Sequence, residues 1–305
     1  MTNFLLGIDG GGSKTVALLA GPDGHVIGRG TAEAANYQAI GLERACAAIV
    51  RAVAAAFVDA RIAPGPVGAV CLGLAGAGRP EDQALFQTWA AQQWPGARVM
   101  IASDAELVLA AGTPGAWGLA LICGTGSIAY ARDRAGRAAR AGGWGYLLGD
   151  EGSGYAIGLA ALHAVARAAD GRGPPTTLTG AVLAHWSLGA PQDLIRRVYR
   201  VSCSNAEVAA LAGLVVGAAA DGDATARQII EGACRELALM LSAAAGQLEM
   251  RGPLPCALAG GLIVNQPALA WGVRAAAADL GLALDPVARV AEPAVGAIGM
   301  AARLL

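Results

Sequence analysis

The stretch Ile8-Asp9-Gly10-Gly11-Gly12-Ser13 decides the fold, because it returns as Ile122-Cys123-Gly124-Thr125-Gly126-Ser127 at a constant offset of 114 residues. In both places an apolar run enters a glycine-rich turn and a second apolar run follows. A hairpin signal comes next, at Pro22-Asp23-Gly24 and at Asp133-Arg134-Ala135-Gly136. The recurrence predicts an internal repeat of two related α/β domains.

Strands alternate with helices around each copy. In the first half, residues 67–74 and 97–102 are apolar strands, and residues 41–58 and 80–93 are predicted helices. In the second half, residues 154–247 are mostly helical, 256–259 form a strand, and helices follow at 267–280 and 293–305. This alternation favours parallel strands joined by right-handed crossovers. We predict one domain from residues 1–114 with the C-terminal helix 292–305, and a larger domain from 115–291 that contains the helical insertion.

The composition excludes several classes of partner. The 305 residues carry 22 basic and 23 acidic side chains, a net charge of −1, which leaves no electrostatic footprint for nucleic acid or an anionic membrane. The longest uncharged stretch, 107–131, contains two glycine turns whose backbone could not be satisfied in lipid. No basic region precedes the first apolar segment, so we expect a cytoplasmic protein. The six cysteines form no C-x-x-C pair, which suggests neither a zinc site nor a redox motif.

The two glycine turns are candidate phosphate-binding loops. Their free backbone N–H groups, facing a common cleft between the domains, suit a chain of phosphates. The alternative is that each is merely a tight hairpin, since glycine is the usual residue where φ is positive. A third turn, at Gly260 and Gly261 after the strand 256–259, favours the binding site. The predicted nucleotide contacts in the first two turns are Gly10, Gly11, Gly12, Ser13, Lys14 and Thr15, and Gly124, Thr125 and Gly126.

Lys14, the only lysine, does not belong to a Walker A loop. That motif requires glycine at the position of Ser13, and it opens a helix, whereas residues 16–20 are typical of a strand. A Rossmann fingerprint fails for the same reason.

Two carboxylates follow predicted strands. Asp9 is placed to hold Mg²⁺ through water beside the first turn, unless it is only a turn residue. Asp104 ends a strand, where ligands gather in open α/β sheets, and could accept the proton of an attacking hydroxyl. Its alternative role is the N-cap of a helix starting at Ala105. Both roles can hold together.

The segment 142–154 is rich in glycine around Trp144 and the pair Asp150-Glu151, which predicts a surface loop with a function. An aromatic plate beside carboxylates suits recognition of a polyol. Alternatively, Trp144 is a core residue at a domain interface, and Asp150-Glu151 only charge the first turn of the next helix.

Taken together, these motifs resemble the N-acetylglucosamine kinase branch of the actin-like sugar kinases, within the BadF/BadG-type ATPase family. The resemblance covers essentially the full length. It rests on the segments 7–15, Asn36 before Ile40-Gly41, 74–76, 103–105, 124–127, 143–153, and Gly260-Gly261 with Asn265.

The resemblance implies two ribonuclease-H-like domains that close on ATP and a sugar, with the last helix returning to the first domain. It implies that Ser13 and Thr125 touch the phosphates, that Gly260, Gly261 and Asn265 lie near the adenosine, and that Asp104 is the base for the sugar 6-hydroxyl. The residues implied to line the sugar pocket are Asn36, Gly76, Gly143, Trp144, Gly145 and Asp150. Relatives also imply a homodimer. Ala75 departs from the pattern, since some relatives have a serine there that offers a hydroxyl contact.

The expected function is therefore an ATP- and Mg²⁺-dependent kinase that phosphorylates the 6-hydroxyl of N-acetylglucosamine or glucosamine. An N-acetylmuramic acid kinase is one alternative. Another is an ATPase activator of an acyl-CoA reductase or dehydratase, although the cysteines lack the spacing that an iron–sulfur cluster needs. A sugar sensor without kinase activity is a third, and Asp9 and Asp104 argue against it.

Overall fold

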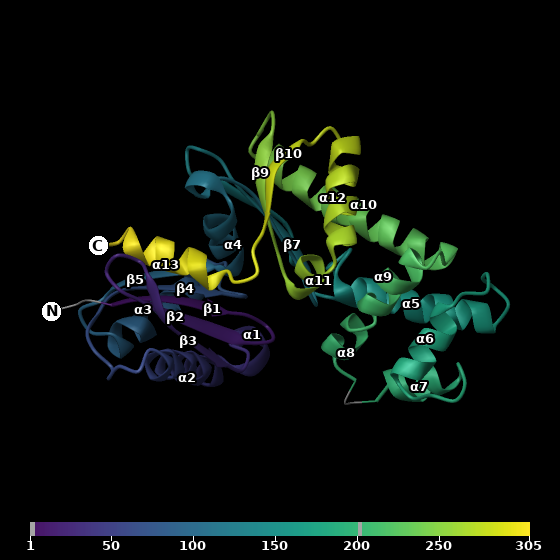
Figure 1. Cartoon of the computed structure of the whole chain (residues 1–305), viewed down its shortest axis with the longest axis horizontal. Coiled ribbons are helices and arrows are strands. Elements are labelled where there is room, and N and C mark those ends of the chain that lie inside the picture. The colour runs from purple at the N-terminus through teal and green to yellow at the C-terminus, as the bar shows by residue number, and fades with distance from the viewer. Residues whose placement is uncertain (1–3, 201–202) are drawn as a thin grey trace. The chain divides into compact units, whose positions relative to one another are not determined.

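A computed structural model describes residues 4–200 and 203–305. The chain forms two compact units, one from the chain up to Trp117 together with Glu292–Leu305, and one from Gly118–Ala291 (Figure 1). The sequence-based division at residue 114 lies three residues before this boundary. It also assigned residue 292 and those after it to the first unit.

Each unit contains one five-stranded sheet, and the two sheets have equivalent strand orders. In each, the first three strands of the unit are antiparallel neighbours and the last two run parallel to the first. This identity of topology confirms the prediction of two α/β domains related by duplication. The first sheet has the order β3 (Val26–Ala32), β2 (Thr15–Ala20), β1 (Phe4–Gly10), β4 (Val67–Leu74), β5 (Arg98–Ser103), and the second has β8 (Ala138–Gly142), β7 (Ser127–Arg132), β6 (Gly118–Cys123), β9 (Leu254–Ala259), β10 (Leu284–Arg289).

Helices cover both faces of the first sheet, which is why its central strands are continuous apolar runs. On one face α2 (Leu42–Asp59) and α3 (Pro80–Gln93) build a core around Ile49 and Phe86. On the other face α4 (Asp104–Gly112) and α13 (Ala294–Ala302) bury Leu107 and Ile298. The final helix thus completes the core of the first unit.

Glycines let α13 approach closer than side chains would permit. A Cβ atom on Gly7 of β1 would lie 2.7 Å from the backbone nitrogen of Ile298. A Cβ atom on Gly296 would lie 2.2 Å from the carbonyl oxygen of Leu107 in α4. Backbone packs on backbone at both places, so neither neighbour can yield by changing a rotamer.

The insertion between β8 and β9 is a helical subdomain with its own core, which includes Ile157, Val182, Leu211 and Val215. Its helices are α5 (Gly154–Ala169), α6 (Leu178–His185), α7 (Asp193–Val198), α8 (Asn205–Ala209), α9 (Ala212–Ala220) and α10 (Ala224–Gln247).

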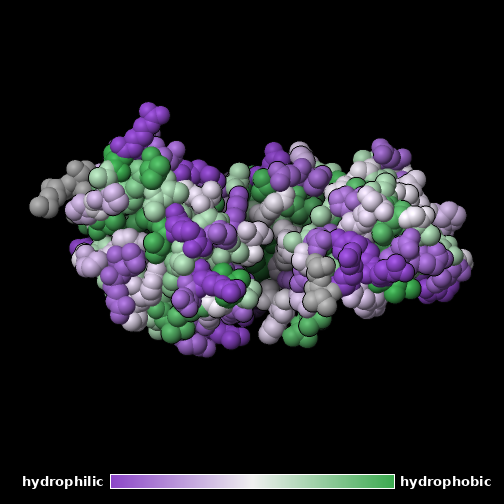
Figure 2. Space-filling view, turned by 90° about the horizontal axis from the view of Figure 1, so that it is seen from below, coloured by the Kyte–Doolittle hydropathy of each residue, from purple (hydrophilic) through white to green (hydrophobic). Residues whose placement is uncertain are grey.

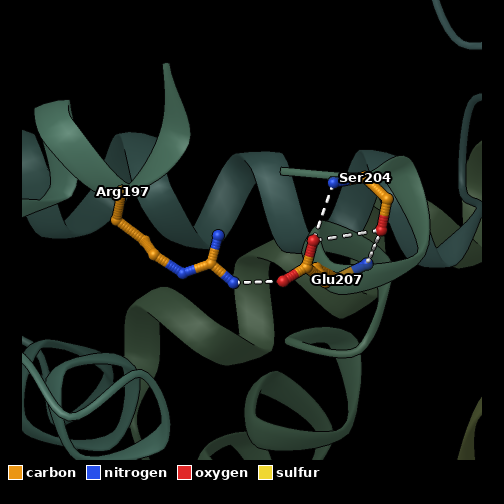
Figure 3. Close-up of polar contacts among 3 residues, drawn as sticks. All are labelled: Arg197, Ser204 and Glu207. Atoms are coloured by element: carbon orange, nitrogen blue, oxygen red, sulfur yellow. Dashed lines mark hydrogen bonds and ion pairs between the residues drawn. The ribbon is translucent and has the colours of Figure 1, made fainter. Parts of the chain in front are cut away.

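One polar cluster ties α7 to α8. The Arg197 guanidinium lies 4.6 Å from the centroid of the Trp186 ring. The same guanidinium forms an ion pair with Glu207 (Figure 3). Glu207 also forms a capping box with Ser204, and the Ser204 backbone N–H, with Arg197, lowers the pKa of the Glu207 carboxyl. All of these residues belong to the helical insertion, where the cluster joins one helix to the next.

Some short elements were not predicted. They are α1 (Tyr37–Ile40), the 3-10 turn Pro114–Ala116, α11 (Gly261–Asn265) before α12 (Pro267–Asp279), and β10. The strand β10 contains Asp285 and Pro286, which normally argue against a strand, but it lies at a sheet edge, where a missing N–H is tolerated.

Within residues 4–200 and 203–305, no single helix is long and apolar enough to cross a membrane. The segments Asn205–Ala220 and Ala224–Gln247 reach the required length and composition only as a pair, bent by 118° at the break. On the face drawn in Figure 2, hydrophilic and hydrophobic residues are interspersed.

The packing of α13 yields a test. We expect Gly296→Ala to lower the free energy of unfolding of the first unit by about 1–3 kcal/mol, because the added methyl group meets a fixed carbonyl. Gly299→Ala in the same helix is the matched control: its Cβ meets nothing within 4 Å, and removing an exposed helical glycine stabilises by up to about 1 kcal/mol. Urea unfolding of both variants measures the difference, and equal stabilities would contradict the packing argument.

Candidate functional site

Strand register brings Asp9 and Asp104 to one edge of the first sheet. Asp9 of β1 pairs with Gly73 of β4, which pairs with Ala102 of β5. Asp104 follows β5 directly. Only β4 separates β1, which carries Asp9, from β5, which Asp104 follows, so these two strands lie about 10 Å apart. Parallel strands thus deliver both carboxylates to the same carboxyl edge.

Asp104 is not the N-cap of its helix, and that alternative prediction is wrong. Ser103 is the N-cap: its hydroxyl accepts a hydrogen bond from the Glu106 backbone N–H at 3.3 Å, and the Glu106 carboxylate accepts one from the Ser103 backbone N–H at 2.9 Å. The Asp104 carboxylate, at the first helical position, accepts a hydrogen bond from the adjacent Ala105 N–H at 2.9 Å. Because Ser103 performs the capping, the Asp104 carboxylate stays available for chemistry. Burial raises its pKa.

Asp9 lies in a site with excess negative charge. Its pKa is raised to about 7, first by burial and then by repulsion from Asp104 and, more weakly, Glu292. Lys14 is the cation that opposes this rise. A partly buried pair of carboxylates with so little compensation suits a hard divalent cation, which prefers oxygen ligands. Among the described residues no three His, Cys, Asp or Glu side chains gather around one metal position.

The first glycine turn leaves its tip open. Gly11 closes the turn by donating to the Lys14 carbonyl at 3.0 Å. Gly12, Ser13 and Lys14 are exposed, and the backbone N–H groups of Gly12 and Ser13 have no acceptor in the described part of the chain. Thr15 differs from the others, because its side chain is fully buried and its hydroxyl donates to the Glu33 carbonyl at 2.6 Å. Its side chain therefore anchors the turn and is directed away from the tip.

Asn36 and Gly76 lie together in the first unit. The Asn36 side-chain oxygen is 3.2 Å from the position that a Cβ on Gly76 would take, and Gly76 has a φ of +84°. Gln38 donates from its side chain to the Gly76 carbonyl at 3.0 Å. Gln38 is a member of this group that the sequence analysis missed, since a polar residue in a four-residue helix carries no periodic signal.

The second glycine turn is joined to the loop that follows β8. The Gly154 N–H donates to the Gly124 carbonyl at 2.8 Å, and the Tyr155 N–H to the Thr125 carbonyl at 3.2 Å. The Asp150 carboxylate accepts from the Ser127 N–H at 3.1 Å and would be 2.9 Å from a Cβ on Gly126. The predicted phosphate loop and the carboxylate predicted for the sugar pocket are thus one connected structure. Burial raises the pKa of Asp150.

The third turn packs against the second. Gly260 has a φ of +97°, and a Cβ there would lie 2.4 Å from the Cys123 carbonyl oxygen. The backbone nitrogen of Gly261 is 3.6 Å from the position of a Cβ on Gly124. Asn265 closes α11 by donating from its side chain to the Gly261 carbonyl at 2.8 Å. The second unit therefore gathers all of its predicted nucleotide contacts on one edge.

Trp144 is 66% exposed and is not a core residue of its own unit. The flanking Gly143 and Gly145 have φ values of +70° and +82°, which few other residues adopt. Leu147 and Leu148 in the same loop are also exposed.

The repeat does not duplicate the acidic chemistry. At the offset of 114, Cys123 stands where Asp9 stands in the first unit. Its thiol is buried against the Gly152 carbonyl, and burial raises its pKa to about 12. The second unit thus has no carboxylate at the position that corresponds to Asp9.

Comparison with known proteins assigns these features to a family. The sequence profile of the BadF/BadG/BcrA/BcrD ATPase family matches residues 6–301. The chain belongs to this family. The predicted membership in the BadF/BadG-type ATPases is thereby confirmed.

Several relatives are amino-sugar kinases by name. The chain is 34% identical, over 86% of each sequence, to the N-acetylmuramic acid/N-acetylglucosamine kinase of Clostridium acetobutylicum. It is 38% identical, over 64% of each sequence, to the N-acetyl-D-glucosamine kinase of Dictyostelium discoideum. A crystal structure from Chromobacterium violaceum, provisionally named N-acetylglucosamine kinase, has a TM-score of 0.78 at 30% identity over 98% of both chains. The actin-like fold implied by the resemblance is confirmed.

The pKa of Asp9 predicts how stability depends on pH. An acid whose pKa is higher in the folded than in the unfolded state stabilises the fold at low pH, and this contribution is lost as pH rises toward the folded pKa of about 7. We expect Asp9→Asn to gain about 2–3 kcal/mol over wild type between pH 5 and pH 8, without nucleotide or divalent cations. Urea unfolding at both pH values measures this, with Glu43→Gln as an exposed acidic control. A gain that does not change with pH would contradict the assignment.

Proposed function

We propose that this chain is an ATP-dependent kinase that transfers the γ-phosphoryl group of ATP to the 6-hydroxyl of N-acetylglucosamine or glucosamine. The observation that carries the proposal is the Asp104 carboxylate, which is partly buried at the carboxyl edge of the parallel strands β1, β4 and β5 and left free by the Ser103–Glu106 capping box. The amino-sugar kinases among the relatives supply the substrate class.

Phosphoryl transfer depends mainly on positioning and on neutralising charge, so few residues need to react. Asp104 accepts the proton of the sugar hydroxyl as that oxygen attacks phosphorus. Its raised pKa brings it nearer to the working pH, which strengthens a general base. Asn36 and Gly76 of the first unit, with Gly143, Trp144, Gly145 and Asp150 of the second, bind the sugar in this proposal.

The three glycine turns bind the nucleotide. Residues 10–14 and 124–126 present backbone N–H groups and the Ser13 and Thr125 hydroxyls to the phosphates, and Thr15 supports the first turn. Gly260, Gly261 and Asn265 contact the adenosine. This division matches the free N–H groups at the tip of the first turn and the close packing of the second turn against the third.

Asp9 would hold Mg²⁺, through water. When bound, the ion would neutralise phosphate charge beside Asp9, where Lys14, the single lysine of the chain, is the cation that lowers the pKa of the carboxyl. The uncompensated charge of Asp9 and Asp104 is what supports this assignment. We further propose a homodimer, as the resemblance implies, and a cytoplasmic location, as the sequence analysis predicts.

A panel of acceptor sugars tests the proposed kinase function. We expect ADP release, measured by a coupled assay, to require N-acetylglucosamine or glucosamine, with N-acetylmuramic acid, N-acetylmannosamine and glucose as comparison sugars. The 6-deoxy analogue of the best acceptor should bind but give no turnover, because it lacks the attacking oxygen. ADP release that is equal with and without sugar would overturn the kinase assignment.

A second test addresses the base. We expect Asp104→Asn to bind sugar and ATP within a few-fold of wild type, measured by calorimetry, and to lose at least about 100-fold in kcat, the usual contribution of general-base catalysis. Glu43→Gln, an exposed acid on α2, is the control and should keep wild-type turnover. Near-normal kcat in Asp104→Asn would show that another group takes the proton.

A further inference from the structure

The helix α1 is too short to hold its own position. It spans only Tyr37–Ile40, and isolated helices of this length are unstable in water. Yet it carries Gln38, and its N-cap is Asn36, the two side chains that meet Gly76. Something outside the helix must therefore fix these side chains.

Tyr37 provides that anchor on the opposite side. Its ring packs edge-on against Phe86 of α3, with centroids 5.5 Å apart, and its hydroxyl donates a hydrogen bond to the Asp82 carboxylate. The aromatic contacts continue from Phe86 to Trp89 and from Trp89 to Trp94. The Tyr37 side chain is thereby fixed to the first turns of α3.

The acceptor is a buried carboxylate, and Tyr37 is its single hydrogen-bond donor among residues 4–200 and 203–305. Asp82 is 6% exposed, and its second carboxylate oxygen has no hydrogen-bond partner in the described part of the chain. No salt bridge to Asp82 is formed among the described residues. The amino end of α3 favours the negative charge, but a buried acceptor without ordinary partners is costly. A buried carboxylate oxygen without a partner calls for an explanation.

Two adjacent residues of α1 thus bind the two ends of the segment that runs from Gly76 to Asp82. Gln38 binds the carbonyl of Gly76, and Tyr37 binds Asp82, six residues later in the chain. We propose that Tyr37 and Asp82 form a positioning clip that fixes Asn36 and Gln38 against Gly76 and so sets the affinity for the acceptor sugar. The inference rests on the proposed function, because it takes Asn36 and Gly76 as sugar contacts.

The clip predicts a selective kinetic effect. Tyr37→Phe removes the hydroxyl and keeps the ring on Phe86. We expect KM for the sugar to rise about 10-fold, while KM for ATP and sugar-independent ADP release stay within 2-fold of wild type. The matched control is Tyr199→Phe, at a tyrosine that is 85% exposed on the helical insertion, and it should leave all three quantities unchanged.

Two further variants separate positioning from stability. Asp82→Asn keeps an acceptor for Tyr37 and should keep a sugar KM within about 2-fold of wild type. The double variant Tyr37→Phe with Asp82→Leu removes the unsatisfied carboxylate, so it should regain thermal stability while its sugar KM stays raised. If the sugar KM instead recovers together with stability, the role is structural and the clip is wrong.

Hydrogen exchange keeps the clip testable apart from the function. Amides of residues 36–40 should exchange faster in Tyr37→Phe than in wild type or Tyr199→Phe. A wild-type enzyme without sugar-dependent turnover would remove the proposed function. An active wild type with an unchanged sugar KM and unchanged exchange in Tyr37→Phe would remove only the clip.

Discussion

The candidate site depends on glycine residues whose backbone lies closer to neighbouring atoms than a side chain would permit. At Gly260 a methyl group would lie 2.4 Å from the Cys123 carbonyl, at Gly126 it would meet the Asp150 carboxylate, and at Gly73 it would lie 2.2 Å from Leu107. Each contact lets one segment rest on the carboxyl edge of a sheet, where strand ends and helix starts converge. These glycines are therefore required by packing, and Gly260 also by its φ of +97°. At the tip of the first turn, the backbone N–H groups of Gly12 and Ser13 have no acceptor in the described part of the chain, which is the property that a phosphate-binding surface needs.

Duplication supplied two equivalent scaffolds, and the chemistry then became asymmetric. The strand that ends in Asp9 has a counterpart that ends in Cys123, a buried thiol packed on the Gly152 carbonyl. The helix that begins at Asp104 after β5 also has no acidic counterpart, because the chain after β10 returns to the first unit as α13. Asp9 and Asp104 thus belong to the first unit alone, and the second unit contributes a different carboxylate, Asp150, which accepts a hydrogen bond from the Ser127 N–H beside its glycine turn.

Sequence reasoning worked where a pattern extends over many residues. The bounds of β4 and α3 were predicted to the residue, and the glycine turns led directly to the repeat. It failed for α1 and α11, which are shorter than one period of a recognisable pattern, and for β10, whose Pro286 is acceptable only because the strand is at an edge. The capping error at Asp104 was avoidable, because Ser103 and Glu106 have the spacing of a capping box. The contacts of Tyr37 and Gln38 join residues that are 45 and 38 positions apart, and no local pattern encodes them.

Charge placement links these observations. Two of the ion pairs among the described residues, Arg51 with Glu33 and Arg172 with Asp170, lie at exposed positions, where they contribute little to stability. Asp9, Asp82 and Asp104 are buried or partly buried without such a partner. A chain with 22 basic residues could have neutralised them, and an arginine beside Asp9 would lower the pKa that burial and the charge of Asp104 raise to about 7. It would also fill the place that a ligand's own cation or proton needs. The unpaired carboxylates therefore lower the stability of the first unit in the free protein, and in the proposed function the cation at Asp9 and the sugar hydroxyl at Asp104 would supply the missing partners.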